Sequence, residues 1–383
     1  MTKLTPKMAS SVKGRTTTTA TVHRAEIEAI QTVPPSKITA PRKVRQVSSD
    51  VSGVAGGCVH VVLYYNKASQ GDSGSLHAGW SKESLAGALS EQPLLAGRLQ
   101  KEKRVGDHEE AKNINVVSND AGVRLVEARI GVTMAEFLLE CNKEAEAELV
   151  FWKDIDQLDP QFSPLLYIQV TKFECDGYSF GISCSLLLAD IFLKENFLKR
   201  WVDIHRNLLS AKDGIPEMPL FYLPNLKKDI PSSLSADISG SSPTKNSGQI
   251  TMIFTVVSPE QYVYYSEEDF NSLAMLSVAE AESKLGSKLG PDFSLMFVTE
   301  PGNVVKIEKC SKYEIKPEQS VPNRIDSASW DDFGANELEF CEGNRTVRVS
   351  HWIGSVSGEL VVAIPYCSTN HGVFGLKMVL GVV

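Results

Sequence analysis

The feature that most constrains this fold is a pair of long apolar runs joined by a tight turn. Residues 165–177 read "LLYIQVTKFECDG" and residues 178–188 read "YSFGISCSLLL". Their β-branched and aromatic content predicts two strands, and the Asp176-Gly177 pair predicts a hairpin turn between them. The second run is apolar on both faces, so we predict that it is a fully buried strand in a sheet that is covered on each side.

Other segments place further strands and helices around this hairpin. A helix is predicted from Ser81 until Pro93 stops it, and residues 93–99 are predicted to be extended. An amphipathic helix follows Asp190, and a third helix is predicted near residues 270–288. Further strands are predicted over residues 60–66, 114–118, 123–130, 249–257, 293–300, 337–344, 347–355 and 358–366. Together these elements predict an α/β fold in which helices cover mixed sheets.

The length of the chain is sufficient for two domains. With 383 residues and 42% hydrophobic content, it can bury two cores. Residues 214–248 contain five prolines and many serines without periodicity, which favours a long connection. We therefore predict an N-terminal domain over residues 26–212, a Pro/Ser-rich crossover linker over 213–248 and a C-terminal domain over 249–383.

Residues 1–25 differ in composition from the rest of the chain. They carry several lysines and arginines, the run "TTTTAT" and no acidic residue. Such a segment cannot bury enough apolar surface to fold alone, and an organelle transit peptide has a similar composition. We predict a disordered or targeting extension, and the compartment stays open between these two interpretations.

Charge, cysteine usage and motifs exclude several classes of function. The formal net charge of −8 argues against a nucleic-acid partner, because phosphate binding depends on clustered Lys and Arg. No apolar run approaches the length of a membrane span. The seven cysteines stand singly without a CxxC pair, which favours a reducing compartment. The sequence contains no HExxH, P-loop, GxGxxG or GxSxG motif, so we expect no metal and no nucleotide cofactor. We also expect a monomeric protein.

Residues 178–190 also have a purely structural interpretation, in which none of them is catalytic. On that interpretation the apolar run is a buried strand, and Asp190 is the N-cap of the helix that follows.

Four segments together resemble the plant BAHD acyltransferase family. They are "QPLLAGRL" (92–99), "FSPLLYIQVTKFECDGYSFGISCSLLLAD" (162–190), the Pro-rich crossover and "DDFGAN" (331–336), and the likeness covers most of residues 20–383. The resemblance implies two chloramphenicol-acetyltransferase-like domains. It also implies an HxxxD motif that ends at Asp190, and a DFGWG-like structural segment in which Asp332, Phe333 and Gly334 match.

The resemblance implies a specific chemistry for the HxxxD positions. The family histidine is a general base that takes a proton from an alcohol or amine, which then attacks an acyl-CoA thioester. The retained motif aspartate, Asp190, would orient that catalytic site. Leu186 stands at the histidine position, and its isobutyl group cannot carry a proton. Loss of a general base typically lowers the rate by about 10²–10⁴, so we expect Leu186 to be non-functional.

Other positions also depart from the family pattern. Ile191 follows Asp190 where the family usually has glycine, and Ala335 and Asn336 replace a Trp-Gly pair. The stretch between residues 297–301 and 331–336 is several dozen residues shorter than the resemblance would require. A strand and helices that help to wall the acyl-CoA channel are therefore expected to be absent.

Three residues are candidates to replace the missing base. His205 lies on the amphipathic helix and is interpreted as partly buried or solvated. Cys184 lies on an apolar strand and is interpreted as a small hydrophobic residue. His351 lies on an alternating strand and is interpreted as structural.

Within the family, residues 162–177 and "DFGAN" followed by Glu337 and "LEF" are similar to the eceriferum/glossy group. That likeness implies an accessory protein that binds a long acyl chain or a condensing enzyme of very-long-chain fatty-acid elongation, in the cytoplasm or at the periphery of the endoplasmic reticulum, and that serves wax synthesis. Two alternatives remain open. One is an active transferase with acyl-CoA as cosubstrate, in which positioning alone supplies the rate; the other is a decaying or mispredicted gene copy.

Overall fold

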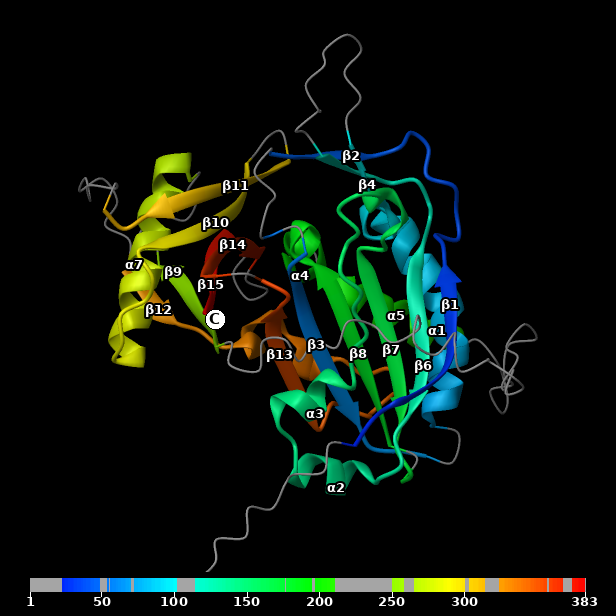
Figure 1. The fold of residues 1–383 in the computed structure, drawn as a ribbon. Coiled ribbons are helices and arrows are strands. Elements are labelled where there is room, and N and C mark those ends of the chain that lie inside the picture. The colour runs from blue at the N-terminus through cyan, green and yellow to red at the C-terminus, as the bar shows by residue number, and fades with distance from the viewer. Residues whose placement is uncertain are drawn as a thin grey trace, which may run out of the picture.

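The structure is a computed structural model that describes residues 23–48, 54, 56–69, 72–101, 114–175, 177–194, 197–210, 250–257, 265–299, 303–313, 324–356, 358–367 and 374–382. The predicted linker and the N-terminal extension up to residue 22 lie outside the described residues. Two mixed sheets with helices against them make up the described fold (Figure 1). This confirms the α/β class with mixed sheets.

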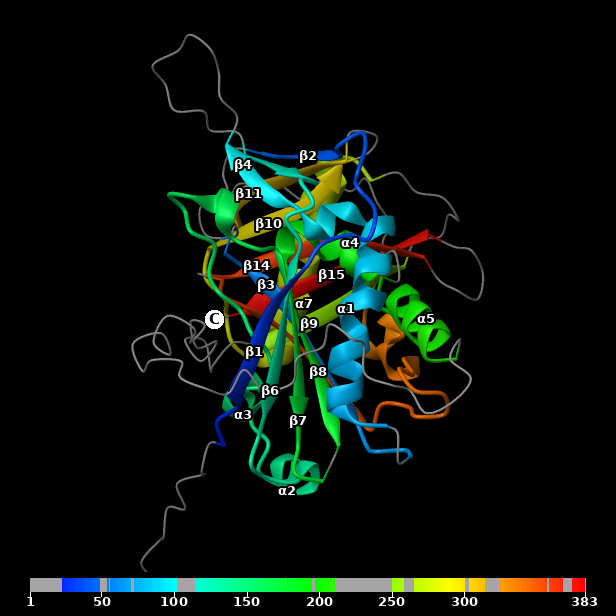
Figure 2. The same ribbon diagram turned by 90° about the vertical axis from the view of Figure 1, so that its right-hand side faces the viewer.

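The first sheet contains six strands in the order β1-β6-β7-β8-β3-β13. Their bounds are β1 Glu26–Val33, β6 Val123–Arg129, β7 Leu166–Lys172, β8 Tyr178–Ser185, β3 Cys58–Tyr65 and β13 Arg348–Gly354. Every residue of β3 and β8 is buried, because both strands are central and are covered on both faces. The helices α1 (Gly74–Glu91) and α5 (Phe197–Ser210) pack against each other beside this sheet (Figure 2).

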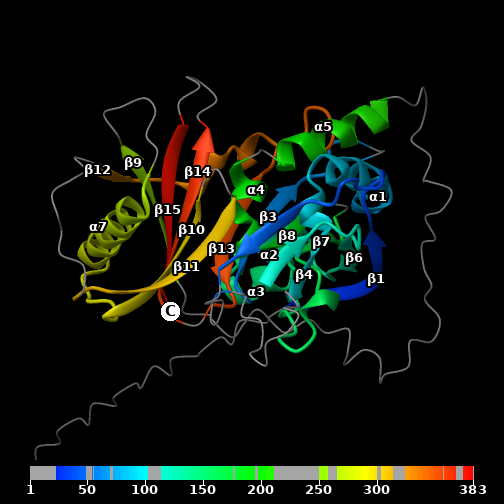
Figure 3. The same cartoon turned by 90° about the horizontal axis from the view of Figure 1, so that it is seen from above.

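The second sheet contains nine strands in the order β12-β9-β15-β14-β10-β11-β2-β5-β4. Their bounds are β12 Arg324–Ser327, β9 Ile250–Val257, β15 Phe374–Val382, β14 Leu360–Cys367, β10 Asp292–Thr299, β11 Val304–Ser311, β2 Val44–Val47, β5 Ile114–Val117 and β4 Arg98–Lys101. The helix α7 (Glu267–Leu285) covers one face of this sheet (Figure 3). A capping box of Ser266 and Asp269 begins α7, and Gly286 ends it in the left-handed region at φ 66°.

The two sheets exchange strands between the two halves of the chain. β2, β4 and β5 come from the first half but pair within the second sheet, while β13 comes from the second half and pairs with β3 over Arg348–Gly354. A hydrophobic core therefore continues from one sheet to the other, with Val61 and Leu85 in the same cluster as Val305 and Val362. The division at residues 213–248 stays a prediction.

Three short helices complete the described fold. They are α2 (Met134–Leu139), α3 (Lys143–Ala147) and α4 (Ala189–Lys194). Thr133 and Glu136 form a capping box at the start of α2. Among the described residues, no helix is both long and apolar enough to cross a membrane.

Most predicted strands are present. The hairpin of β7 and β8 is antiparallel with Lys172 opposite Tyr178, as predicted, although Asp176 of its turn lies outside the described residues. The predicted strands at 60–66, 114–118, 123–130, 249–257, 293–300, 347–355 and 358–366 are confirmed as β3, β5, β6, β9, β10, β13 and β14. The helix predicted near residues 270–288 is confirmed as α7.

Several local predictions were wrong. The first helix begins at Gly74 rather than Ser81, because Ser73 caps it by accepting a hydrogen bond from the Leu76 amide at 3.3 Å. Residues 93–96 form a 3-10 turn instead of an extended segment, since proline suits the first position of a helical turn. The helix predicted after Asp190 is present as α4 and α5, and residues 195–196 lie outside the described residues.

Residues 337–344 do not form the predicted strand. Leu338 and Phe340 enter the core as an alternating pattern would require, but no described strand pairs with this segment, which has only an isolated bridge between Cys341 and Asn344. The Leu338 carbonyl instead accepts a hydrogen bond from the Tyr65 hydroxyl at 3.0 Å. Side-chain periodicity alone therefore could not distinguish a strand from a buried loop.

Candidate functional site

Leu186 lies where β8 ends and the chain enters a 3-10 turn over Leu186–Leu188. The predicted strand to Leu188 thus stops at Ser185. Leu186 is only 2% exposed, and its amide donates a hydrogen bond to the Gly57 carbonyl at 2.9 Å. A Cβ atom at Gly57 would come within 2.6 Å of Leu186 Cδ1. The position is therefore a closely packed apolar site.

Asp190 lies in the first turn of α4 and is not the N-cap that the sequence predicted. Its two carboxylate oxygens each accept a hydrogen bond of 2.7 Å from the guanidinium of Arg45. The side chains of Arg45 and Asp190 are 0% and 13% exposed. Arg45 also donates to the Leu187 carbonyl at 3.2 Å. The carboxylate therefore binds the motif turn to β2, a strand of the second sheet.

The Arg45–Asp190 pair gives the Asp190 carboxylate a structural role. A bidentate pair between guanidinium and carboxylate is planar and charge-assisted, and it fixes both groups. Removal of one partner would leave a buried charge without compensation. The pair can thus stabilise the fold with no proton transfer at position 186.

Cys184 is buried on β8, two residues before Leu186. Burial raises the pKa of its thiol well above the usual range, and the nearby Asp190 carboxylate raises it further. A thiol held in the neutral form is a poor nucleophile. This agrees with the interpretation of Cys184 as a small hydrophobic residue.

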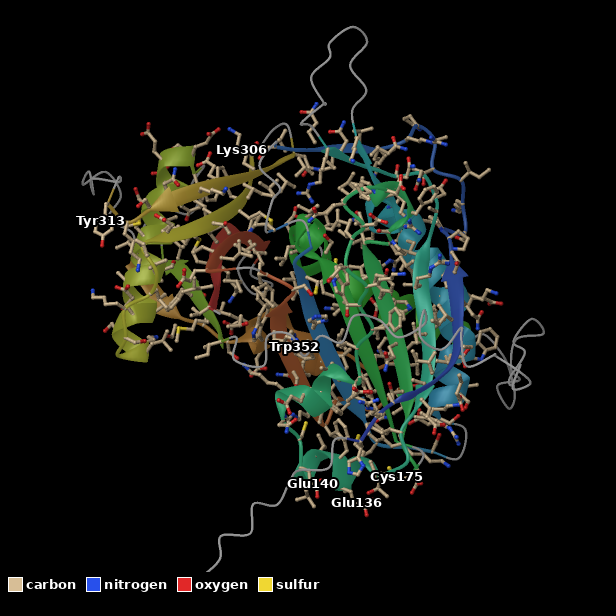
Figure 4. The ribbon with its side chains drawn as sticks, viewed as in Figure 1. Glu136, Glu140, Cys175, Lys306, Tyr313 and Trp352 are labelled. Carbon is tan, nitrogen blue, oxygen red and sulfur yellow. The ribbon has the colours of Figure 1, made fainter. Side chains whose placement is uncertain are left out.

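The sequence did not single out His60, which lies on β3 directly opposite Ser183 of β8. One ring nitrogen, Nδ1, lies 2.8 Å from the Ser183 hydroxyl, and the other, Nε2, lies 3.1 Å from the Cys58 thiol. The ring also contacts Trp352 of β13 at a centroid distance of 4.9 Å (Figure 4 labels Trp352). Burial lowers the pKa of His60 to about 3, so the imidazole is neutral. His60 and Ser183 are polar residues within otherwise mostly apolar strand sequences, and this pattern is the sequence signal that could have identified the pair.

A second buried network contains His205. Its Nδ1 lies 2.9 Å from the Ser84 hydroxyl, and its Nε2 lies 3.0 Å from Nδ1 of His77. His77 Nε2 in turn lies 2.7 Å from the Asp72 carboxylate, which also accepts a hydrogen bond of 2.8 Å from Asn344. His205 is completely buried, so its interpretation as partly buried or solvated was wrong.

The burial and the contacts of the His205 network indicate a structural role. Burial lowers the pKa of His205 well below its usual value, and the neighbouring His77 lowers it further. The network joins α1, α5 and the turn at Asn344, and its histidines have no exposed ring. It therefore stabilises the contact between the two halves of the chain, and a substrate has no access to it in this conformation.

His351 of β13 stacks on Trp330 with a centroid distance of 4.9 Å and an angle of 5° between the rings. Burial lowers the pKa of His351 to about 4. The stacked, neutral ring agrees with the structural interpretation of this residue.

Asp332, Phe333 and Gly334 form a capped turn near the molecular surface. Asp332 accepts a hydrogen bond of 2.8 Å from the buried Lys377 ammonium and also caps the turn with Ser329. Gly334 ends the turn in the left-handed region at φ 76°, which favours glycine. The Lys377 ammonium lies 5.2 Å from the Phe333 ring centroid. The three residues thus connect the turn to β15.

Residues 339–343, "EFCEG", repeat part of the same pattern. They offer an acidic residue, a phenylalanine and a final glycine at the first, second and fifth positions of the DFGWG segment. Phe340 is completely buried, and its ring stacks on Phe180 with a centroid distance of 4.0 Å. Gly343 has φ 73°. Sequence reasoning missed this second match because Asp332 to Gly334 reproduces three consecutive letters of the motif.

No group of three His, Cys, Asp or Glu side chains within the described part of the chain could hold a metal ion. The structure brings Leu186, Asp190 and Cys184 together at the end of β8. His205, His351 and Asp332 belong to separate clusters.

Comparisons with known proteins extend these observations. A sequence model described as the Transferase family matches residues 24–252. Protein ECERIFERUM 26-like of Arabidopsis thaliana is 31% identical over 143 residues, 36% of this chain and 32% of that protein. The 17,18-epoxy-17-hydroxycur-19-ene N-malonyltransferase of Strychnos nux-vomica is 31% identical over 159 residues, 41% of this chain and 31% of that protein. The chain thus matches about a third of the length of these curated relatives.

The crystal structure of vinorine synthase is 15% identical to this chain. The likeness covers 94% of this chain and 95% of that structure, with a TM-score of 0.41.

Proposed function

Because the chain belongs to the Transferase family, the BAHD acyltransferases, and has a buried leucine at the family's histidine position, we propose that it lacks acyl-transfer chemistry of its own. It acts instead as an accessory, acyl-binding protein in very-long-chain fatty-acid elongation and wax synthesis. The single observation that supports the loss of chemistry is the environment of Leu186. The Leu186 side chain is aliphatic and buried at the end of β8, so it cannot accept a proton.

Nearby titratable groups support the same proposal. The His60 imidazole is neutral and could accept a proton, but it is completely buried and already lies within hydrogen-bond distance of Ser183 and Cys58. General-base catalysis requires the base to reach the proton that it removes, either directly or through one water molecule. His60 therefore cannot replace the family histidine without a rearrangement of β3 and β8.

The likeness to ECERIFERUM 26-like supports the biological part of the proposal. We propose a condensing enzyme of fatty-acid elongation as the partner, and the cytoplasm or the periphery of the endoplasmic reticulum as the location. The protein would act as a monomer toward this partner. A long acyl chain or acyl-CoA is its proposed ligand.

Rescue of a plant that lacks the gene tests this role. Wild-type protein, Leu186→Ala, Leu186→His and Asp190→Asn would be expressed, and the chain lengths of surface waxes would be measured together with the protein level. We expect Leu186→Ala and Leu186→His to rescue whenever they accumulate, because no proton transfer at this position is needed. Loss of rescue by Asp190→Asn at a normal protein level would contradict the proposal, since the amide keeps the shape of the side chain.

A biochemical assay tests the absence of transfer directly. Purified protein would be incubated with a panel of acyl-CoA thioesters and alcohols or amines, and release of the CoA thiol would be followed. We expect no release above the background without protein. Catalytic release with formation of an ester or amide would overturn the proposal.

An active transferase is the second candidate, and the likeness to an N-malonyltransferase favours it. Correct orientation of two bound reactants can lower a barrier by about 7–11 kcal/mol without a general base. In that case thiol release would depend on both substrates and would be insensitive to pH near neutrality. The assay above distinguishes the two candidates.

A further inference from the structure

A cavity of about 300 Å³ lies away from Leu186, where the edge strand β12 separates from β9. Ser327 is the last residue of β12 to pair with β9, and the Ala328 amide then donates to the Ile253 carbonyl at 2.9 Å. Beyond that hydrogen bond the chain turns away at Ser329 and Trp330. The cavity walls are Thr251, Met252, Ile253, Phe254, Lys284, Ser327, Ala328, Ser329 and Trp330.

Residues from both faces of β9 line the cavity. Four consecutive residues of β9 line it, and successive side chains of a strand point to opposite faces. Phe254 and Met252 belong to the core beneath α7, whereas Ile253 and Trp330 belong to the core shared by the two sheets. A ligand in the cavity would therefore contact an apolar surface on each side of the strand edge.

The cavity lining combines one cationic side chain with several apolar side chains. Lys284, in the last turn of α7, supplies the only cation of the lining, and its ammonium lies 5.3 Å from the Phe254 ring centroid. Its ion pair with Glu280 is long, at 3.6 Å, and both side chains are partly exposed. A water-exposed pair at this distance is weak, so the ammonium can bind another anion. Trp330 also lines the cavity, and its ring stacks on His351.

The volume limits the size of the ligand. Small-molecule sites typically enclose about 300–1,000 Å³, so this cavity is at the lower end of that range. It admits a medium-length hydrocarbon chain but not a whole acyl-CoA. A lining that contains an ammonium and apolar side chains, among them Trp330, matches a molecule with an anionic head and an apolar tail.

We propose that this cavity binds a medium-chain fatty carboxylate, with the carboxylate paired to Lys284 and the hydrocarbon chain against Met252, Ile253 and Trp330. The inference rests on the proposed acyl-binding function and specifies a site for it. No residue of β8 lines this cavity. The proposed binding of a carboxylate is therefore independent of whether another residue acts as a base near Leu186.

Titration of the full chain with decanoate tests the site. Binding would be measured by calorimetry and by tryptophan fluorescence, with the Trp330→Phe variant used to assign the optical signal. We expect saturable binding of one decanoate per chain. Lys284→Gln should weaken the affinity by about tenfold, the loss of one charge-assisted hydrogen bond. Uncharged decanol should bind the wild type more weakly than decanoate.

Lys288→Gln is the matched control. Lys288 is also a lysine near the end of α7, but its side chain is 90% exposed and it does not line the cavity. Its substitution should leave the affinity unchanged. A second variant, Ala328→Leu, adds side-chain volume to the wall and should reduce binding while the unfolding midpoint confirms that the protein is folded.

The site would be refuted by the absence of saturable decanoate binding, or by equal affinities of the wild type and Lys284→Gln. Such a result, together with intact rescue of wax synthesis, would overturn the cavity assignment alone. Transfer activity of the purified protein would overturn the proposed function and leave the decanoate measurement unaffected.

Discussion

Leu186 and Asp190 are four residues apart, and the structure places their side chains in opposite environments. Leu186 packs against Gly57 in the apolar core, while Asp190 forms a bidentate ion pair with Arg45. At this scale Leu186 is a core residue. Asp190 binds an arginine of β2.

The Arg45–Asp190 pair should contribute strongly to stability. Asp190→Ala leaves the buried Arg45 charge unpaired, and breaking a buried pair in this way costs about 3–5 kcal/mol. Urea denaturation of the purified variant would measure the loss. As a control, Arg200→Ala breaks the exposed pair with Glu91 and should change the unfolding midpoint little. An Asp190→Ala variant as stable as the wild type would contradict this role.

Gly57 and Leu186 should be coupled. Gly57→Ala places a methyl group 2.6 Å from Leu186 Cδ1 and 3.1 Å from the Val54 carbonyl, an overpacking that typically costs about 1–3 kcal/mol. Leu186→Ala alone should cost about 2–5 kcal/mol through the cavity that it leaves. The double variant should lose less free energy of unfolding than the sum of the two single losses. The methyl group added at position 57 would partly fill the space that Leu186→Ala leaves. Strictly additive free energies of unfolding would contradict the packing described.

At the scale of elements, two buried histidines and one half-buried histidine connect strands and helices that are distant in the sequence. His60 joins β3 to β8, His351 stacks beneath Trp330, and His205 joins α5 to α1. Each ring is held neutral by burial, which lowers its pKa. Protonation of His60 or His205 would place a charge in the core.

These histidines predict a loss of stability in mild acid. Their pKa values are lowered in the folded state, to about 3 for His60 and about 4 for His351. The unfolded chain, with ordinary values near 6.5, therefore binds more protons below that pH. Stability is fully present above pH 6.5 and should fall by about 1.4 kcal/mol per pH unit per histidine below it. Urea denaturation at pH 7 and pH 5.5 would measure this, and His60→Asn should reduce the slope.

At the scale of the whole molecule, neither sheet is built from one half of the chain. β13 completes the first sheet from the second half, and β2, β4 and β5 extend the second sheet from the first half. Phe340, also from the second half, packs among Phe180 and Trp201 of the first. The exchange predicts that the two halves fold together.

A fragment of residues 23–210 tests this dependence. Without β13 the edge of β3 is unpaired over seven positions, and β2, β4 and β5 lose the sheet that they join. We expect the fragment to be insoluble or to unfold without cooperativity, and coexpression with residues 250–383 to restore a soluble complex. Cooperative unfolding of the isolated fragment at the midpoint of the full chain would show that the halves are independent.

The sequence by itself determined the α/β class, the hairpin of β7 and β8 and the absence of a base at position 186, since these follow from local periodicity and residue identity. Position 186 is a leucine in any conformation, so no tertiary contact can give it a proton to carry. The tertiary structure alone decided the partner of Asp190, the burial of His205 and the exchange of strands. Each of these joins residues that are distant in the chain, and Arg45 lies 145 positions from Asp190. Local patterns specify which face of an element is apolar, whereas the neighbour that covers the face depends on how the whole chain packs.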